Sequence, residues 1–257
     1  MYEQEFELAI KAAMLAGEHL LSHYQPRVDS QAGKDIKLNA DRESENIIIT
    51  TLAESGYSLL SEERGFITGK TKQNGLRWII DPLDGTANYW RGITELACVS
   101  VALWNGDTPV LGVVNRFSQG EVYCGIVGEG AWLNDNPIHT SDVTCLKDVF
   151  FATGFPVKRD YSEASLGNFI KQVQVCKKIR MLGTAAIMGA LLAAGKLDIY
   201  MEDRIMLWDV AASAALVQAA GGAADLKLLP DNQCLCRLFA NRYLQSELEN
   251  FSKNKVI

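Results

Sequence analysis

The chain has 257 residues, of which 48% are hydrophobic and 22% are charged, and its formal net charge is −6 at pH 7. This length and composition can supply a large hydrophobic core without stabilising disulfides or metals. The acidic balance does not favour a nucleic-acid partner, and no apolar run has the length of a membrane span. The six cysteines are irregularly spaced, and with only three histidines they form no zinc-ligand pattern. We therefore expect a cytoplasmic protein with reduced thiols and no membrane partner.

The first part of the chain is predicted to contain helices followed by an antiparallel sheet. Apolar residues recur at helical spacing over residues 3–24, and Asp41 is the predicted N-cap of a second helix. Residues 25–40 and 65–75 are polar and are expected to be irregular. Strands separated by turn residues are predicted at 57–61, 78–80, 96–104, 109–115 and 121–127, with a further strand and turn at 128–137.

From about residue 141 strands and helices alternate. Strands are predicted at 149–152, 179–181 and 197–201, and helices at 162–176, 184–194 and 209–220. The two parts, residues 1–140 and 141–257, are expected to pack as one unit, because no low-complexity linker separates them. The pattern predicts a mixed α and β protein built in stacked layers.

One stretch carries the clearest chemical signal. The apolar residues 78–80 predict a buried strand, which Asp81-Pro82 is expected to end, because proline removes a backbone donor and fixes φ. Asp84 follows three residues after Asp81, and Gly85 allows a close approach that a Cβ would block. The two carboxylates could hold a divalent cation, and the backbone amide beside them could hold an anion next to it.

Acids occur in three further places that could contribute to the same site. They are Glu62-Glu63 at a strand end, Asp209 at the start of an apolar helix, and Asp41. Two cations held by such acids can activate water and stabilise a leaving oxygen in phosphoryl transfer, whereas clustered carboxylates without a cation repel one another. Each acid also has a structural interpretation, as a turn, a helix cap or a solvated loop. The sequence alone does not bring the acids together.

Other kinds of site fit the sequence less well. The acids at 81 and 84 are three apart, whereas haloacid-dehalogenase phosphatases space theirs two apart, and neither a P-loop nor a dinucleotide fingerprint occurs. His19 and His23 lie four apart on the first helix, which fits a metal pair or, as we favour, an exposed face. Arg91 could reach a second anionic group, but we favour a surface arginine.

The combined motifs identify the chain as similar to the inositol monophosphatase family. The resemblance rests on 81-DPLDGTAN-88, on 61-SEE-63 before it and on 207-LWDVAAS-213 after it, supported by 183-GTAA-186 and 130-GAWLN-134. These motifs run in order over nearly the whole chain. The resemblance implies a five-layer αβαβα fold, an enzyme that depends on Mg²⁺ and is inhibited by lithium, and a homodimer.

The resemblance also implies roles for individual residues. Glu62, Asp81 and the carbonyl of Leu83 would hold a first Mg²⁺, and Asp81, Asp84 and Asp209 a second, with a third, weaker ion on Glu62. Glu62 and Thr86 would position the attacking water, and Asp41 would orient Thr86. The amides of Gly85 and Thr86 would receive the phosphate. The alcohol would face Gly183, Thr184, Ala185 and Glu202. Asp84 would contact both a metal ion and the substrate.

The expected function is therefore hydrolysis of inositol monophosphate or a similar small alcohol phosphate. Related activities stay open: fructose 1,6-bisphosphatase, histidinol phosphatase and 3′(2′),5′-bisphosphate nucleotidase. A different class is a regulatory role, since some bacterial members of the family act with the transcription machinery.

Overall fold

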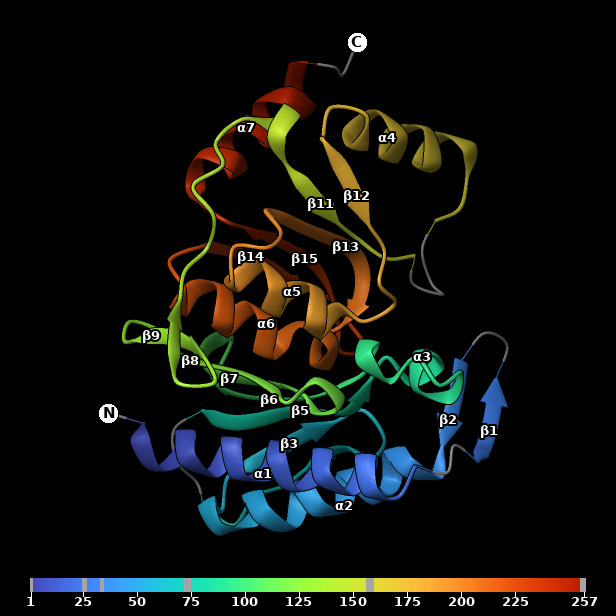
Figure 1. Cartoon of the computed structure of the whole chain (residues 1–257), viewed down its shortest axis with the longest axis vertical. Helices are drawn as coiled ribbons and strands as arrows, with labels where there is room; N and C mark the ends of the chain where they lie inside the picture. The colour runs from blue at the N-terminus through green and yellow to red at the C-terminus, as the bar shows by residue number, and fades with distance from the viewer. Residues whose placement is uncertain (1, 25–26, 33–34, 72–74, 156–159, 255–257) are drawn as a thin grey trace.

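The computed structural model describes residues 2–24, 27–32, 35–71, 75–155 and 160–254 (Figure 1). Its helices are α1 (Glu3–Ser22), α2 (Asn39–Leu52), α3 (Thr86–Trp90), α4 (Glu163–Val173), α5 (Ala185–Ala193), α6 (Leu207–Ala219) and α7 (Arg242–Asn254). Short 3-10 turns cover Ala53–Ser55, Thr94–Leu96, Phe117–Gln119 and Leu146–Asp148. The strands before residue 140 are β1 (Val28–Ala32), β2 (Asp35–Leu38), β3 (Ser58–Ser61), β4 (Gly65–Ile67), β5 (Leu76–Asp84), β6 (Cys98–Asn105), β7 (Thr108–Arg116), β8 (Glu121–Ile126), β9 (Gly130–Leu133) and β10 (Asn136–Ile138). The later strands are β11 (Phe150–Ala152), β12 (Lys178–Arg180), β13 (Ile199–Met206), β14 (Ala223–Leu228) and β15 (Gln233–Phe239).

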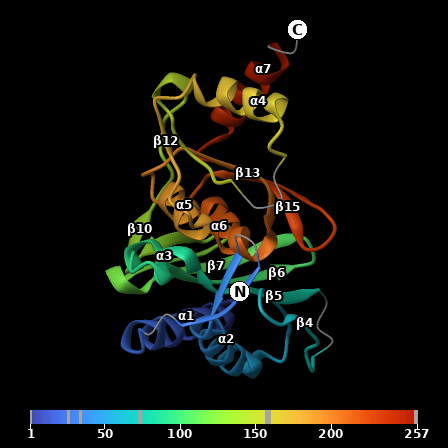
Figure 2. The same cartoon turned by 90° about the vertical axis from the view of Figure 1, so that its right-hand side faces the viewer.

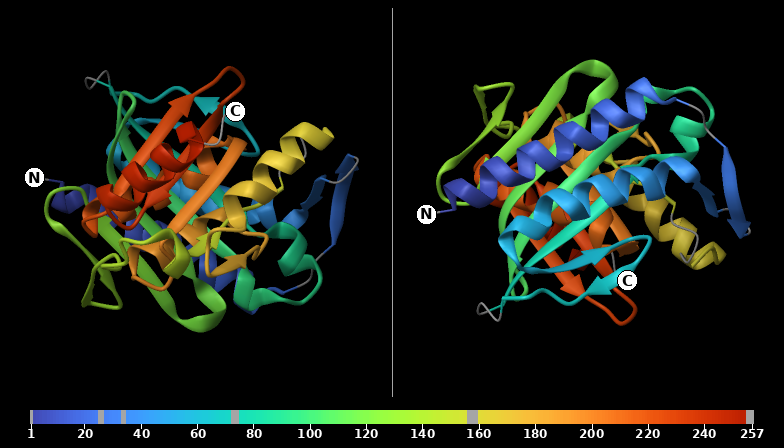
Figure 3. Two further views of the ribbon diagram at one scale, coloured as in Figure 1. Left: turned by 90° about the horizontal axis from the view of Figure 1, so that it is seen from above. Right: turned by 90° about the horizontal axis from the view of Figure 1, so that it is seen from below.

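The elements stack in five layers, which confirms the αβαβα prediction. Helices α1 and α2 cover one face of an eight-stranded sheet, and α5 and α6 lie between that sheet and a five-stranded sheet (Figures 1 and 2). Helices α4 and α7 lie over the outer face of the five-stranded sheet, and α1 and α2 run side by side below the larger sheet (Figure 3). This arrangement places α5 and α6 in the interior, which explains why both helices are apolar on nearly every side.

The eight-stranded sheet has the order β10-β9-β8-β7-β6-β5-β3-β4. Its strands pair antiparallel except for β3 and β5, which are parallel. The carboxyl ends of β3 and β5 therefore lie beside each other. As a result, the acids that follow Ser61 and the acids of the 81–84 turn come to the same edge of the sheet.

The five-stranded sheet has the order β12-β11-β13-β15-β14. Strand β11 is parallel to β12 and β13, while β15 is antiparallel to both of its neighbours. The apolar core between the sheets includes Trp104, Met188, Val210 and Leu216, all almost completely buried. This packing fixes the start of α6, and with it Asp209, against the larger sheet.

Strand β5 does not end where the sequence predicted. It continues through Pro82 to Asp84, and its pairing with β6 shifts register, so that Asp81 faces Ser100 and Asp84 faces Cys98. The one extra residue in β5 forms an irregularity of the bulge type, which accommodates the missing N–H of Pro82 within the strand. The turn that carries the acids is thus part of the sheet.

Some other local predictions are also wrong. The 25–40 stretch was expected to be irregular, but its described residues include the antiparallel hairpin β1–β2. Residues 25–26 and 33–34 are not among the residues that the structure describes. The described side chains of β1 are exposed, and β2, although Leu38 on it is buried, is only four residues long, so the hairpin is too short to show a clear apolar pattern in the sequence. The 65–75 stretch contains β4, and its residues 72–74 are likewise not described. Strand β13 extends past residue 201 to Met206, and the elements after residue 220 were not predicted.

Candidate active site

The turn after Asp81 is held by hydrogen bonds to its backbone. Ser44 on α2 donates to the Pro82 carbonyl at 2.7 Å, and the Leu83 amide donates to Asp81 Oδ1 at 3.0 Å. Gly85 follows with φ of +85°, a conformation that side chains with a Cβ rarely adopt. A Cβ at Gly85 would lie 2.4 Å from the Leu96 carbonyl oxygen. The sequence expectation of a close approach at this glycine is therefore explained by Leu96.

Asp41 and Thr86 meet beside this turn. The Thr86 hydroxyl lies 3.1 Å from Asp41 Oδ1 and 2.8 Å from the Leu83 carbonyl oxygen, either of which can accept its hydrogen bond. Asp41 is not the N-cap of α2 but its third residue, and its Oδ2 accepts the Leu38 amide at 2.6 Å. Burial raises the pKa of the Asp41 carboxyl to about 7. Burial therefore disfavours the ionised form of this acid.

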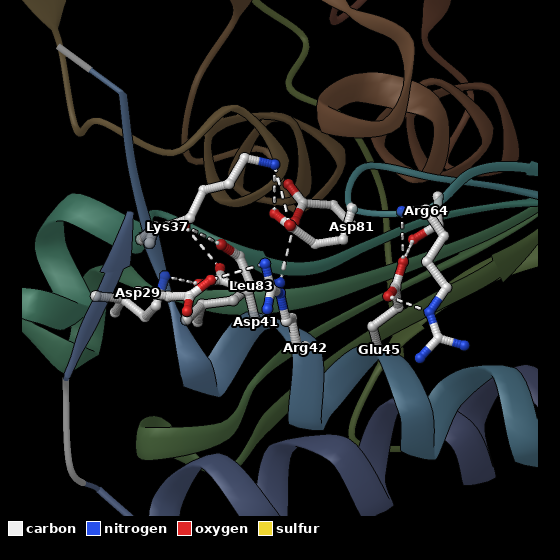
Figure 4. A network of polar contacts seen from close by, with 12 residues as sticks. Asp29, Lys37, Asp41, Arg42, Glu45, Arg64, Asp81 and Leu83 are labelled. Carbon is white, nitrogen blue, oxygen red and sulfur yellow. Dashed lines mark hydrogen bonds and ion pairs between the residues drawn. The ribbon is translucent and has the colours of Figure 1, made fainter. Parts of the chain in front are cut away.

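Glu62 and Glu63 follow β3, and the residues on either side of them are fixed by one buried acid. Glu45 on α2 accepts hydrogen bonds from the Ser61 hydroxyl and the Arg64 amide, and its second oxygen lies 3.1 Å from Arg64 Nε (Figure 4). Lys37 pairs with Glu63 at 2.9 Å. Sequence reasoning assigned no role to Glu45 or Lys37, because only the fold places α2 and β2 beside this turn.

Asp84 is held by the start of α5. Its Oδ2 accepts hydrogen bonds from the Thr184 hydroxyl at 2.6 Å and from the Ala186 amide at 2.7 Å. Thr184 is the N-cap of α5 and accepts the Ile187 amide through the same hydroxyl. Burial raises the pKa of Asp84 to about 6, and these donors oppose the rise.

The electrostatics show that four acids from three segments lie close together. Burial raises the pKa of Asp81 well above its usual range, and the charges of Glu62, Asp84 and Asp209 raise it further. Burial also raises the pKa of Glu62 to about 8, although a hydrogen bond with the Asp81 side chain lowers it. The pKa of Asp209 is raised by burial and then by Glu62, Asp84 and Glu202.

This set of donors fits a hard divalent cation. Buried carboxylates that raise one another's pKa are stabilised by positive charge, and oxygen atoms are the ligands that Mg²⁺ prefers. The hydrogen bond between Glu62 and Asp81 requires a proton between two carboxyl groups, a position that suits a cation equally well. Among the described residues, no three His, Cys, Asp or Glu side chains are arranged around one point as a complete metal site. The structure therefore brings the acids into electrostatic contact without forming a coordination shell.

The residues expected to face the alcohol come from two segments. The backbone of Gly183 has φ of +73° and leads into Thr184 and Ala185 at the start of α5. Glu202 on β13 is buried and accepts a hydrogen bond from the Tyr200 hydroxyl at 2.8 Å. Its charge raises the pKa of Asp209, which shows that Glu202 lies near the acidic cluster.

One residue of the motif has a contact that the sequence did not predict. The side-chain amide of Asn88 on α3 donates to the carbonyl oxygens of Leu96 and Leu182, each at 2.9 Å. Asn88 is part of the motif that carried the resemblance, so its position was visible in the sequence. Its partners were not, because one of them lies 94 residues away in the chain.

The remaining candidates lie apart from the acids. His19 stacks on His23 at a centroid distance of 4.5 Å and lies 2.9 Å from Glu43, so this pair has a carboxylate neighbour that the sequence did not reveal. Arg91 is exposed, and its guanidinium lies 5.2 Å from the centre of the Trp90 ring. All six cysteines are free thiols.

A comparison with known families identifies the fold. The sequence profile described as "Inositol monophosphatase family" matches residues 1–226. The chain belongs to the inositol monophosphatase family. Members of this family are typically Mg²⁺-dependent phosphomonoesterases, and the family's substrates are phosphate esters.

Characterised relatives within the family carry two kinds of name. The chain is 34% identical over 223 residues to the inositol-1-monophosphatase of Mesorhizobium japonicum, covering 83% of this chain and 82% of the relative. It is 33% identical over 225 residues to the Nus factor SuhB of Pasteurella multocida, covering 84% of this chain and 82% of the relative. Relatives with either kind of name are therefore about equally similar to this chain in sequence.

Solved structures of the family agree with the fold. The extragenic suppressor protein suhB of Bartonella henselae superposes with a TM-score of 0.84 at 30% identity, covering 98% of both chains. An inositol monophosphatase from Anabaena (Nostoc) sp. superposes with a TM-score of 0.84 at 28% identity, covering 98% of this chain and 96% of the other. In the described part of the chain, no helix is both long and apolar enough to cross a membrane.

Proposed function

We propose that this protein is a Mg²⁺-dependent phosphomonoesterase that hydrolyses inositol monophosphate or a similar small alcohol phosphate. The observation that carries the proposal is the buried acidic cluster, in which Glu62, Asp84 and Asp209 all raise the pKa of Asp81. A cluster of this kind is unfavourable unless a cation neutralises it, and membership of a Mg²⁺-dependent family supplies the cation.

The metal ligands follow from the sequence motif and are consistent with the contacts in the turn. Glu62, Asp81 and the carbonyl of Leu83 would hold one ion, and Asp81, Asp84 and Asp209 a second, with Glu62 also serving a third, weaker one. When bound, the ions would supply the positive charge that lowers the pKa of water and stabilises the phosphate and the leaving alcohol. Asp81 is the shared ligand, in keeping with its place at the centre of the electrostatic interactions.

The chain's own groups would position the water and the phosphate. The Thr86 hydroxyl donates toward Asp41, so its lone pairs are free to accept a hydrogen bond from the attacking water, which Glu62 would hold from its other side. The amides of Gly85 and Thr86 would receive the phosphate oxygens. The oxygen of that water would attack phosphorus opposite the leaving alcohol, as the water loses a proton and the bond from phosphorus to the alcohol oxygen breaks. The departing alcohol oxygen would take up a proton from solvent, and no covalent enzyme intermediate would form.

The alcohol would be recognised by the segment Gly183–Ala185 and by Glu202. A buried carboxylate such as that of Glu202 suits hydroxyl groups, which donate hydrogen bonds to it. This chemistry favours a polyhydroxylated alcohol, and it leaves fructose 1,6-bisphosphate, histidinol phosphate and 3′(2′),5′-bisphosphate nucleotides as alternative substrates. We further propose a cytoplasmic homodimer, in which residues 1–140 and 141–257 of each chain act as one unit.

A substrate panel tests the proposal. Phosphate release would be measured from inositol, sugar, histidinol and nucleotide phosphates, with and without Mg²⁺ and with added Li⁺. We expect Mg²⁺-dependent release that Li⁺ inhibits, fastest for an inositol or sugar phosphate. Inactivity over the whole panel would contradict the enzyme proposal.

A second candidate function is a regulatory role in transcription, favoured by the relatives named Nus factor SuhB. The net charge of −6 supports contact with a protein more than with RNA. The discriminating experiment is complementation of a deletion strain with an Asp81→Asn variant. Complementation by this variant would favour the regulatory role, whereas its failure beside a functional parent would favour catalysis.

A further inference from the structure

The amide of Asn88 joins two parts of the site that are distant in the sequence. It donates to the Leu96 carbonyl at 2.9 Å, and that carbonyl oxygen is the atom that a Cβ on Gly85 would meet at 2.4 Å. The same amide donates to the Leu182 carbonyl at 2.9 Å and approaches the Gly183 carbonyl at 3.4 Å. One NH₂ group thus contacts both the backbone behind the phosphate turn and the segment expected to face the alcohol.

The chemistry of these contacts requires an amide donor. All three partners of Asn88 Nδ2 are carbonyl oxygens, which only accept hydrogen bonds, and an NH₂ group has two protons for them. A carboxylate in the same place would face oxygens with no proton to share. An apolar side chain of the same size would leave partly buried carbonyls without a donor.

A second connection fixes the end of the same segment. Thr184, which follows Gly183, donates to Asp84, and the Ala186 amide does the same. Asp84 therefore holds the far side of the segment, while Asn88 holds its near side at Leu182 and Gly183. Loss of the Asn88 contacts would free the near side while leaving the Asp84 contacts in place.

We propose that Asn88 is a positioning residue that sets the distance between the phosphate turn and the alcohol-facing segment at residues 182–184. This inference rests on the proposed phosphatase function. Because Asn88 Nδ2 donates only to backbone carbonyls, this amide touches neither the proposed metal ligands nor the reacting atoms. Its removal should therefore slow hydrolysis of a phosphate ester whose alcohol reaches residues 182–184 more than hydrolysis of an ester whose alcohol does not. A displacement of about 1 Å can cost roughly a hundredfold in rate.

The test compares two substrates in matched variants. Asn88→Leu removes the donor without adding charge, and Asn88→Asp removes it while keeping the shape. Asn105→Asp, at an exposed position at the end of β6, adds the same charge away from the site. For each protein, kcat/KM would be measured for inositol monophosphate and for methyl phosphate, whose alcohol is too small to reach the segment. Hydrogen exchange at residues 182–186 and Mg²⁺ affinity by calorimetry would be measured in parallel.

We expect both Asn88 variants to lose at least about tenfold in the ratio of kcat/KM between the two substrates, through KM for inositol monophosphate. Exchange at residues 182–186 should become faster, with Mg²⁺ affinity and the Asn105→Asp control unchanged. An equal loss on both substrates would indicate a purely structural role and overturn the inference, as would unchanged exchange. If the parent protein hydrolysed neither ester, the proposed function would fail, and the inference that depends on it would fail with it.

Discussion

The Thr184 hydroxyl donates a hydrogen bond to Asp84 Oδ2 at 2.6 Å, across 100 residues of sequence. Asp84 lies at the end of β5 in the larger sheet, and Thr184 caps α5 in the layer between the sheets. Both residues are buried. The contact fixes the orientation of one proposed metal ligand and, at the same time, the start of the segment proposed to face the alcohol.

Replacing Thr184 with Val should destabilise the protein by about 1–3 kcal/mol, because the change removes a helix cap and a donor to a buried carboxyl. Thr184→Ser keeps the hydroxyl and is the matched control, with a much smaller effect expected. Urea unfolding followed by circular dichroism measures the difference. Equal stability of the Val and Ser variants would show that the hydroxyl does not hold Asp84 as described.

Replacing Asp81 with Asn should abolish phosphate release while the fold stays intact. Asp81 is the proposed shared ligand, so the loss should exceed the roughly 10–100-fold typical of removing a partner outside the ligand shell. Circular dichroism checks the fold, and calorimetry checks that Mg²⁺ binding is lost. Asp107→Asn is the control, since the Asp107 side chain is 79% exposed and lies on another turn. Normal hydrolysis by the Asp81 variant would contradict the site.

Without Mg²⁺, the protein should become less stable as the pH rises from about 5 to about 8. Burial raises the pKa of Asp84 to about 6, of Asp41 to about 7 and of Glu62 to about 8, whereas unfolded carboxyls ionise near 4. Over this range the folded protein retains protons that the unfolded chain has released, so the free energy of unfolding falls with pH. Bound Mg²⁺ should reduce or reverse the fall, because it stabilises the ionised acids.

Thermal unfolding in EDTA and in Mg²⁺, followed over the same pH range, measures this effect. The decline in EDTA should be smaller for the Asp81→Asn variant, which has one fewer buried acid. A melting temperature in EDTA that is independent of pH would show that the acids are not held close together.

Replacing Gly154 with Ala should impair recognition of the alcohol. A Cβ at Gly154 would lie 2.5 Å from Glu202 Oε2 and 2.8 Å from Oε1, so the Glu202 carboxylate would have to move. We expect KM for inositol monophosphate to rise about tenfold or more, with a smaller effect on methyl phosphate. Gly167→Ala on α4 is the control, since a Cβ there meets nothing within 4 Å. A KM equal to that of the parent would show that Glu202 does not contact the alcohol.

The local elements were largely predictable because their patterns are local. Alternating apolar residues separated by turn residues indicated β6, β7 and β8 to within about two residues, and helical spacing indicated α1. The hairpin β1–β2 was missed because its strands are only five and four residues long and the described side chains of β1 are exposed. The continuation of β5 through Pro82 was missed because the pairing shift that accommodates proline belongs to the contact with β6.

By itself, the sequence identified the family and the layered fold, since these depend on motifs and on the period of apolar residues, and it supplied the residue types of the proposed site. The tertiary structure decided which acids meet. Glu62 and Asp81 share an edge because β3 and β5 are parallel neighbours, and Asp209 joins them because α6 packs between the two sheets. It also decided the roles of Glu45 and Asn88, whose hydrogen-bond partners lie on other elements. A hydrogen bond depends on distance in space, and no pattern of neighbouring residues encodes a distance between segments so far apart in the chain.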